Sequence, residues 1–333
     1  MRLLSVTAPT LTLALCALVN AIPLVRDDSF AGYLMTGFFD RSHNVEQFLS
    51  DGNNPTSFKQ LNQGNPILSS TVGTHGIRDP YLVTNHERSV FYLLATDLDI
   101  NVPDFSWDVA TRNGSRGLVV WTSPNLVDWT GPSLPIVETP EAGMLWAPSA
   151  VFDETNEGWN VFWSSRFFDT SDTAHSGVST YDRIRTSFTR DFATFTTPND
   201  YVSLTDTSVI DQEFQYLGTP GNYVRFLKNV TSSQIFAEKT TTGIFGTWDR
   251  IPGNARDESP REGALAYKDN LQPDKYYLWL DDYIQYIAYE TTDILNNDWT
   301  PSESGGIPPY IKHGSIFSVT QAEHDLLLTT YPI

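Results

Sequence analysis

The sequence predicts an all-β chain folded as a five-bladed β-propeller, on three observations. Short runs of Val, Ile, Phe, Tyr and Trp alternate with clusters of Gly, Asn, Asp, Pro and Thr, and helical periodicity is hard to find after the N-terminal segment. A two-part unit recurs at intervals of roughly 50 to 65 residues, a period typical of propeller blades with about four strands each. The two ends of the chain carry complementary parts of one further unit.

Four complete copies of the unit follow one another along the chain. Each copy opens with an apolar strand, at 90–97, 159–166, 222–229 and 275–282. Each closes with a strand ending in Thr or Ser, a turn with Asp or Asn and an aromatic residue, at 119–130, 184–197, 235–250 and 287–300. The closing aromatics are Trp129, Phe195, Trp248 and Trp299.

A fifth, degenerate copy stands at the N-terminus, at 32–40 and 45–61, and it lacks an inner strand. Near the C-terminus, 313–320 (HGSIFSVT) is a strand without a blade. Pairing the two would close the ring and remove an exposed sheet edge, which is otherwise an aggregation hazard. We therefore expect residues 22–333 to form a single propeller domain without an appended carbohydrate-binding module.

Residues 1–21 predict a secretory signal with cleavage after Ala21, because they combine one basic residue, an apolar middle and small residues near the end. The protein is therefore expected to be secreted and extracellular. Its only cysteine, Cys16, lies inside this signal, so the mature chain would rely on its core rather than on disulfides. Asn113 (NGS) and Asn229 (NVT) are acceptor sites for N-glycosylation.

Charge and composition narrow the class of partner. The formal net charge of −19, from 40 acids and 21 bases, argues against nucleic acid or an anionic membrane. No segment after the signal is long and apolar enough to span a bilayer. Aromatic residues make up 13% of the chain, which suits sugar binding as well as a β core, and most of these rings are expected to fill the core.

Acidic residues stand where the inner strands begin. The segments that enter these strands are 76–83, 145–153, 208–218, 261–269 and 312–320, and three of them carry Asp79, Asp211 and Glu262. Inner strands converge on the propeller axis, so these distant acids should meet in one funnel. Asp79 could instead cap the turn before Pro80. Glu213 is a nearby alternative to Asp211, and Glu258 is a nearby alternative to Glu262.

Carboxylates that meet in one site have a known use in glycosidic cleavage. An inverting enzyme needs one protonated acid to assist the leaving group and one ionised carboxylate to activate water. A third carboxylate near the acid would raise the pKa of that acid by like-charge repulsion. Three acids that meet at one funnel would fit such a site.

The ordered motifs RDP (78–80), WAP (146–148), VID (209–211), EG (262–263) and HG (313–314) resemble glycoside hydrolase family 43 over nearly the whole mature chain. This family contains five-bladed arabinofuranosidases, arabinanases and xylosidases. The resemblance implies Asp79 as general base, Asp211 as pKa modulator and Glu262 as general acid. It also implies inversion of configuration, no required cofactor and a terminal pentose as the sugar released.

Further site residues are expected from the same resemblance. Trp146 is either a core residue or a wall of the sugar pocket, and Phe167 is a candidate aromatic at the rim. Arg261 is either a substrate contact or a surface charge. His313 should lie near the axis, where many family members place a histidine beside a structural calcium ion, although calcium prefers oxygen ligands.

The predicted function is a secreted, exo-acting α-L-arabinofuranosidase whose substrates are arabinan, arabinoxylan or derived oligosaccharides. A β-xylosidase or an exo-galactanase would differ only in the shape of the pocket. A non-catalytic sugar-binding propeller would bind without turnover, and a fructosidase from related propeller families would retain configuration.

Overall fold

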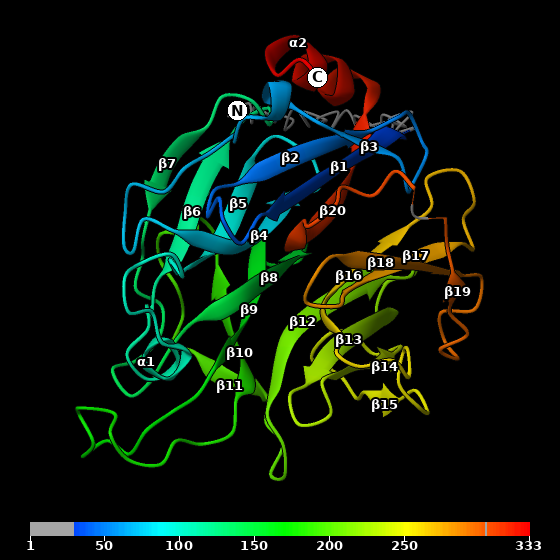
Figure 1. Cartoon of the computed structure of the whole chain (residues 1–333). Helices are drawn as coiled ribbons and strands as arrows, with labels where there is room; N and C mark the ends of the chain where they lie inside the picture. Colours follow the sequence, from blue (N-terminus) through cyan, green and yellow to red (C-terminus); the bar gives the residue numbers. More distant parts are fainter. Residues whose placement is uncertain (1–29, 304) are drawn as a thin grey trace, which may run out of the picture.

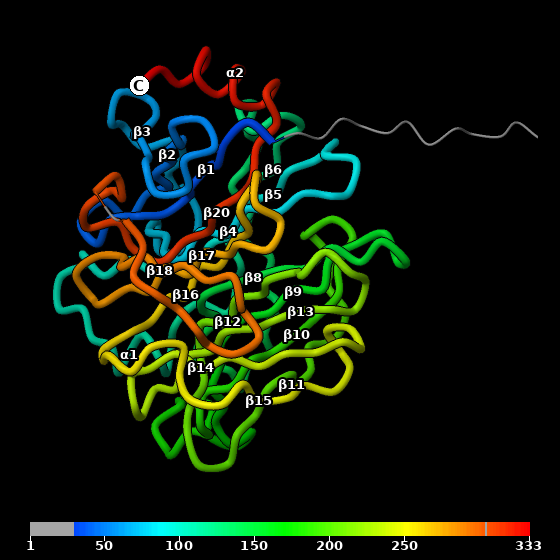
Figure 2. The backbone as a smooth tube through the Cα atoms, turned by 90° about the vertical axis from the view of Figure 1, so that its right-hand side faces the viewer, coloured from blue at the N-terminus to red at the C-terminus, as the bar shows by residue number. Residues whose placement is uncertain are grey.

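The computed structural model describes residues 30–303 and 305–333, so the predicted signal at 1–21 lies outside the described residues. Its named strands form five four-stranded antiparallel sheets around a common hub. Figure 1 shows the sheets around the ring, and Figure 2 shows the same arrangement from the side. The predicted five-bladed propeller is confirmed.

Each blade runs from an inner strand on the hub to an outer strand on the rim, and we number the blades 1 to 5. Blade 1 consists of β20 (Lys312–Thr320), β1 (Phe30–Phe38), β2 (Glu46–Ser50) and β3 (Phe58–Gln60), and blade 2 of β4 (Ile77–Thr84), β5 (Phe91–Asp97), β6 (Leu118–Ser123) and β7 (Thr130–Ser133). Blade 3 consists of β8 (Trp146–Asp153), β9 (Gly158–Ser165), β10 (Arg183–Thr189) and β11 (Asn199–Val202), and blade 4 of β12 (Val209–Tyr216), β13 (Tyr223–Asn229), β14 (Gln234–Thr240) and β15 (Asp249–Arg250). Blade 5 consists of β16 (Glu262–Lys268), β17 (Tyr276–Asp281), β18 (Tyr286–Thr291) and β19 (Thr300–Pro301).

The ring closes through its two ends. The C-terminal strand β20 is the inner strand of blade 1 and pairs antiparallel with β1, for example Leu34 with Phe317 and Met35 with Ile316. The predicted pairing of terminal segments is therefore confirmed. Because β20 fills the inner position, the degenerate N-terminal copy becomes a complete blade with no open edge at the hub.

Short helices decorate the ring. The helix α1 (Trp107–Arg112) lies between β5 and β6, and a 3-10 turn (Asn62–Gly64) follows β3. The C-terminal helix α2 (Gln321–Thr330) begins with a capping box formed by Thr320 and Glu323, and its Leu327 is fully buried. The side chain of Glu323 also pairs with Arg88 of the β4–β5 turn, which ties α2 to blade 2.

The hydrophobic core is divided among the five interfaces between neighbouring blades. One cluster joins blades 1 and 2 and another joins blades 2 and 3, and the series continues around to a cluster between blades 5 and 1. The largest fully buried side chains are Trp121, Trp163 and Trp279. Most of the aromatic content thus fills the spaces between neighbouring sheets, as the sequence suggested.

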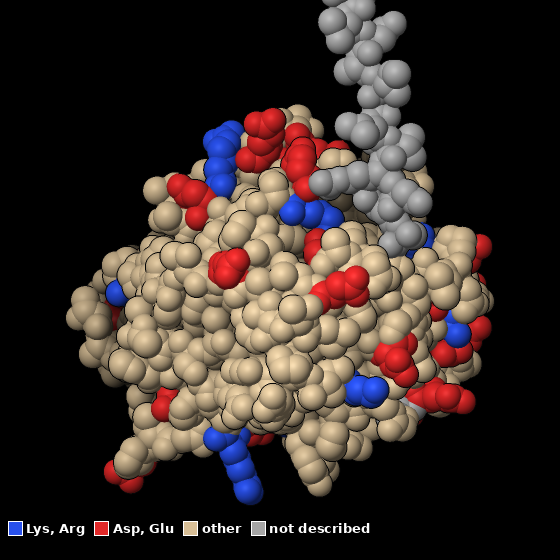
Figure 3. All heavy atoms as spheres, turned by 90° about the horizontal axis from the view of Figure 1, so that it is seen from above, with Lys and Arg blue, Asp and Glu red and all other residues tan. Residues whose placement is uncertain are grey.

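The surface of the molecule matches the low content of charged residues. On the face shown in Figure 3, acidic side chains lie mostly singly among uncharged residues, and the described Lys and Arg side chains form no broad basic patch. None of the helices in the described part of the chain combines the length and the apolar character that crossing a membrane requires.

Candidate active site

Every inner strand carries a bulge close to its first residues. The register shifts where β4, β8, β12 and β16 pair with their neighbours, and again opposite His313 and Gly314 in β20. At the first four bulges one residue adopts a left-handed backbone, with φ between 49° and 54°: Asp79, Ala147, Asp211 and Gly263. A bulge turns side chains away from the regular alternation of a strand, and here the five bulges ring the hub. The motifs RDP, WAP, VID, EG and HG each lie at one of these bulges.

The three predicted carboxylates meet in one cavity of about 100 Å³ at this end of the hub. Asp79, Asp211 and Glu262 all line it, together with His313 and Trp146. The remaining lining residues are Phe38, Arg78, Leu98, Trp107, Ile210, Asp281 and Lys312. Residues from all five blades therefore surround a space close to the size of one small molecule.

Asp79 is held as an ionised carboxylate. Its Oδ1 lies 3.2 Å from Nδ1 of His313, and its Oδ2 accepts a hydrogen bond of 2.8 Å from the hydroxyl of Thr96. Burial alone would raise the pKa of Asp79, but His313, Arg78 and Thr96 outweigh it and lower this pKa below its usual value. Thr96 is itself oriented, because its hydroxyl accepts the backbone N–H of Ala147 at 2.8 Å.

Glu262 lies in a different electrostatic environment. Burial raises the pKa of Glu262, the negative charge of Asp211 raises it further, and these effects exceed the opposing effects of Lys228 and His313. The ammonium group of Lys228 donates to Oε2 of Glu262. Asp211 approaches the same site through Gly263, whose backbone N–H donates to Oδ2 of Asp211 at 3.4 Å. The two cavity acids Asp79 and Glu262 thus have pKa values shifted in opposite directions.

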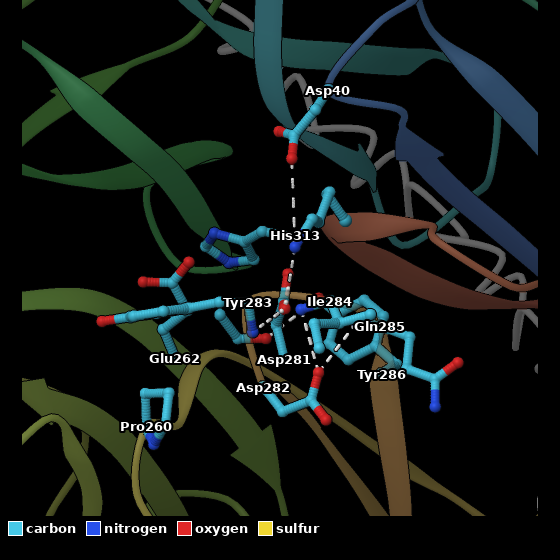
Figure 4. Close-up of polar contacts among 12 residues, drawn as sticks. Asp40, Pro260, Glu262, Asp281, Asp282, Tyr283, Ile284, Gln285, Tyr286 and His313 are labelled. Atoms are coloured by element: carbon cyan, nitrogen blue, oxygen red, sulfur yellow. Dashed lines mark hydrogen bonds and ion pairs between the residues drawn. The ribbon is translucent and has the colours of Figure 1, made fainter.

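A fourth carboxyl group, Asp281, lines the cavity from the end of β17 and is only 1% exposed. Burial raises its pKa to about 6, although Lys312 opposes this rise. Its Oδ1 lies 3.2 Å from Nζ of Lys312, which also faces Asp40 at 4.0 Å, and Asp40 pairs with Arg78 at 2.9 Å. Figure 4 shows Asp40 and Asp281 on either side of the ammonium group that they share, with His313 nearby.

These contacts repeat from blade to blade. A polar residue within two positions of the end of the second strand of one blade reaches the bulge of the next blade around the ring. The five contacts are Asp40 with Arg78, Thr96 with the N–H of Ala147, Ser164 with the N–H of Asp211, Lys228 with Glu262, and Asp281 with Lys312. The cavity therefore depends on the whole ring, because each bulge is positioned by the preceding blade.

Two tryptophans form one wall of the cavity. Trp146 is half-buried at the first position of β8, and its ring meets that of Trp107 edge to face, with centroids 6.0 Å apart. Trp107, in α1, is 52% exposed, and the Arg78 guanidinium lies 5.8 Å from the centroid of its ring. Of the two interpretations of Trp146, the structure favours the pocket wall. Trp107 was not foreseen, because an aromatic in an isolated short helix gives no sequence signal.

Comparisons with known proteins identify the family to which the chain belongs. A family model described as "Probable glycosyl hydrolase domain", related to glycoside hydrolase family 43, matches residues 28–325. The chain belongs to this family. The resemblance found in the ordered motifs is thereby confirmed.

One curated relative of this glycosyl hydrolase domain is an arabinofuranosidase. An α-L-arabinofuranosidase of Bifidobacterium longum subsp. longum is 29% identical over 332 residues, which cover 80% of this chain and 31% of the relative. The chain thus spans about a third of the length of that protein.

Among solved structures, the catalytic domain of a family 62 α-L-arabinofuranosidase from Coprinopsis cinerea matches with a TM-score of 0.51 and 13% identity, covering 75% of this chain and 77% of that one. An α-L-arabinofuranosidase from Podospora anserina, in complex with cellotriose, matches with a TM-score of 0.50 and 12% identity, covering 75% and 76% of the two chains. These likenesses establish a shared fold.

Two expected substrate contacts of the glycosyl hydrolase domain lie outside the cavity lining. The ring of Phe167 packs against the guanidinium of Arg185, 4.7 Å from its centroid. Arg261 donates to the carbonyl of Pro260 at 2.7 Å and to the hydroxyl of Tyr289 at 3.4 Å. The structure therefore does not bring either side chain together with the three acids.

The rival acids are also separate from the site. Glu258 is exposed, and the hydrogen bond from Arg256 lowers its pKa to about 2. Glu213 lies further along the hub, in a second cavity with Tyr81 and Ala266, and burial raises its pKa to about 8. The bulge at Asp211 separates Asp211 from Glu213, although a regular strand would place these two acids on one face.

Calcium remains a prediction that the donor set at His313 does not favour. Burial would lower the pKa of His313, but the hydrogen bond and charge of Asp79, with the charges of Asp211 and Glu262, raise it to about 9. A cationic imidazole repels a metal ion. Across residues 30–303 and 305–333, no three His, Cys, Asp or Glu side chains are grouped so as to hold a metal.

Both glycosylation acceptors lie within the described residues. Asn113 is exposed at the C-terminal cap of α1. Asn229 is half-buried, and its Oδ1 accepts hydrogen bonds from Thr207, Thr231 and Ser232. Glycosylation at either residue stays a prediction.

Proposed function

We propose that this chain is a secreted, inverting and exo-acting α-L-arabinofuranosidase. Its substrates would be arabinan, arabinoxylan or oligosaccharides derived from them, and its catalysis would need no cofactor. The glycosyl hydrolase membership supplies the class of reaction. Arabinofuranose is supported by the relative at 29% identity, which is named an α-L-arabinofuranosidase.

One observation carries the proposal: two carboxyl groups with oppositely shifted pKa values line one small cavity. Asp79 has a lowered pKa and Glu262 a raised pKa. A pair of carboxyls that differ in this way can supply a base and an acid at the same pH. The volume of about 100 Å³ suits a single sugar unit better than the middle of a chain, which supports release of terminal residues.

The proposed mechanism is a single displacement. Ionised Asp79 accepts a proton from water as that water attacks the anomeric carbon, and Glu262 gives its proton to the glycosidic oxygen as the bond breaks. Asp211 raises the pKa of Glu262 through its charge, so Glu262 keeps its proton until the leaving group needs it. His313 and Thr96 hold the carboxylate of Asp79 in one orientation.

The test is a panel of aryl α-L-arabinofuranoside, aryl β-xyloside, aryl β-galactoside and linear arabino-oligosaccharides, with the anomer of the first product followed by NMR. We expect cleavage of arabinofuranosides and an initial product of the opposite anomeric configuration. Cleavage of xylosides or galactosides alone would replace the sugar in the proposal. Retention of configuration would exclude the single displacement, and binding without any turnover would favour a sugar-binding propeller.

The pH dependence of activity follows from the same two groups. Asp79 must be ionised, so kcat/KM should rise as the pH increases through the pKa of Asp79, which lies below the ordinary 3.8. Glu262 must be protonated, so kcat/KM should fall as the pH increases through the pKa of Glu262, which lies above the ordinary 4.5. A pH series of kcat/KM should therefore be bell-shaped, with its maximum between the pKa values of the two groups. A rate that keeps rising to pH 9 would contradict the assignment of the two roles.

A further inference from the structure

The loop between β17 and β18, residues 282–285, stands beside Glu262 and presents two large side chains to solvent. Tyr283 is 47% exposed and Ile284 is 61% exposed. Figure 4 shows this loop next to Glu262 and His313. Exposed aromatic and aliphatic residues at the edge of a concave site commonly mark a contact surface for ligands.

Tyr283 is held from two directions, which distinguishes it from an ordinary residue in an exposed loop. Its backbone N–H donates to Oδ1 of the buried Asp281 at 2.7 Å, and its φ of 73° is left-handed. Its hydroxyl accepts a hydrogen bond of 3.2 Å from Nζ of Lys228, and that ammonium also lies 5.1 Å from the centroid of the ring. Both anchors are side chains that reach the cavity or its acids, so the ring has a fixed position relative to the site.

Lys228 connects this ring to the proposed general acid, because the same ammonium donates to Oε2 of Glu262. Only one side chain therefore separates the Tyr283 hydroxyl from the Glu262 carboxyl. A general acid donates its proton to the oxygen that stays with the leaving group, so the leaving group must lie on the side of Glu262. Asp79, which would activate the water, is held instead by His313 and Thr96.

We propose that Tyr283, with Ile284 beside it, binds the first sugar ring of the leaving group. The apolar face of a neutral sugar ring would lie against the exposed ring and aliphatic side chain. Lys228 would hold the aromatic ring in place through its hydrogen bond to the hydroxyl. The inference rests on the proposed function, because it takes Glu262 to be the general acid, and it adds a binding position for the part of the substrate outside the cavity.

The test compares two substrates that share the sugar released and differ in the leaving group. One is whichever of α-1,5-arabinotriose and arabinofuranosyl-xylotriose the wild type cleaves faster, and the other is methyl α-L-arabinofuranoside. Tyr283→Ala should lower kcat/KM for the oligosaccharide at least about ten times more than for the methyl glycoside. Tyr283→Phe keeps the aromatic face but loses the hydroxyl that accepts from Lys228, so it should lose less of the oligosaccharide preference than Tyr283→Ala.

Tyr216→Ala is the matched control, because Tyr216 is 42% exposed and lies at the far end of β12 from the cavity. This variant should keep the wild-type ratio of the two kcat/KM values, and thermal unfolding should show all three variants folded. An equal fall on both substrates, or no fall, in Tyr283→Ala would overturn the inference while leaving the proposed function intact. A wild type that cleaves no arabinofuranoside would overturn both.

Discussion

Glu262→Gln is expected to reduce kcat/KM on arabinofuranosides with a sugar leaving group by about 10²- to 10⁴-fold, the range that general acid catalysis contributes. Glutamine keeps nearly the same shape and can still accept a hydrogen bond from Lys228, but it has no proton to give to the glycosidic oxygen. The measurement is the rate of pentose release from arabino-oligosaccharides by wild type and variant at the pH optimum of the wild type.

The leaving group provides the decisive control for this prediction. An aryl arabinofuranoside with an acidic phenol needs little protonation as its bond breaks, so Glu262→Gln should lose much less activity on it. Asp79→Asn should instead lose activity on both substrates to a similar extent, because both need an activated water. If the folded Glu262→Gln variant lost the same factor of kcat/KM on both substrates, Glu262 would not be the general acid.

The ring and its acids could be predicted from the sequence because both leave local signals. Strand-and-turn units repeat at a blade-like period, and Asp79, Asp211 and Glu262 each stand where an inner strand begins. The completion of blade 1 by β20 was also predictable, since an N-terminal copy without an inner strand and a C-terminal strand without a blade need one another.

The partners of these acids could not be predicted in the same way. Lys228 and Asp281 are visible in the sequence as polar ends of apolar strands, in 222–229 and 275–282. Each of them, however, contacts the inner strand of the following blade, and that offset is a property of the closed ring. The alternation of apolar and polar residues along the strand did not predict that Arg261, next to Glu262, would point toward Tyr289.

The bulges explain a further difference between sequence and structure. In RDP and VID the acid itself takes the left-handed position, whereas in EG the glycine takes it and Glu262 precedes it. A Cβ added to Gly263 would lie 2.9 Å from Cγ of His313, so glycine at this position lets the imidazole approach. The proposed base Asp79 is thus itself the left-handed residue of its bulge, whereas the proposed acid Glu262 is the residue before it. No single motif reveals this difference.

Gly314→Ala is expected to destabilise the protein by about 3 kcal/mol, because overpacking against backbone atoms that cannot rotate away is costly. A Cβ at this position would lie 1.9 Å from the carbonyl oxygen of Thr36 and 2.9 Å from Cα of Gly37, both in β1. The strain would fall on the β1–β20 pair that closes the ring. Urea unfolding should show the loss as a lower midpoint, with Gly305→Ala as control because a Cβ there meets nothing within 4 Å.

The same substitution should also reduce activity beyond its effect on folding, since ring closure and catalysis share this segment. The N–H of Gly314 donates to the hydroxyl of Tyr286 at 3.1 Å, and that hydroxyl donates to the carbonyl of Gly263 at 2.9 Å. A shift of β20 would therefore move His313, which orients Asp79, and the backbone next to Glu262. We expect the fully folded Gly314→Ala variant to show a lower kcat with native-like circular dichroism. A variant with the unfolding midpoint and kcat of Gly305→Ala would show that the closing strand does not position the two carboxyl groups.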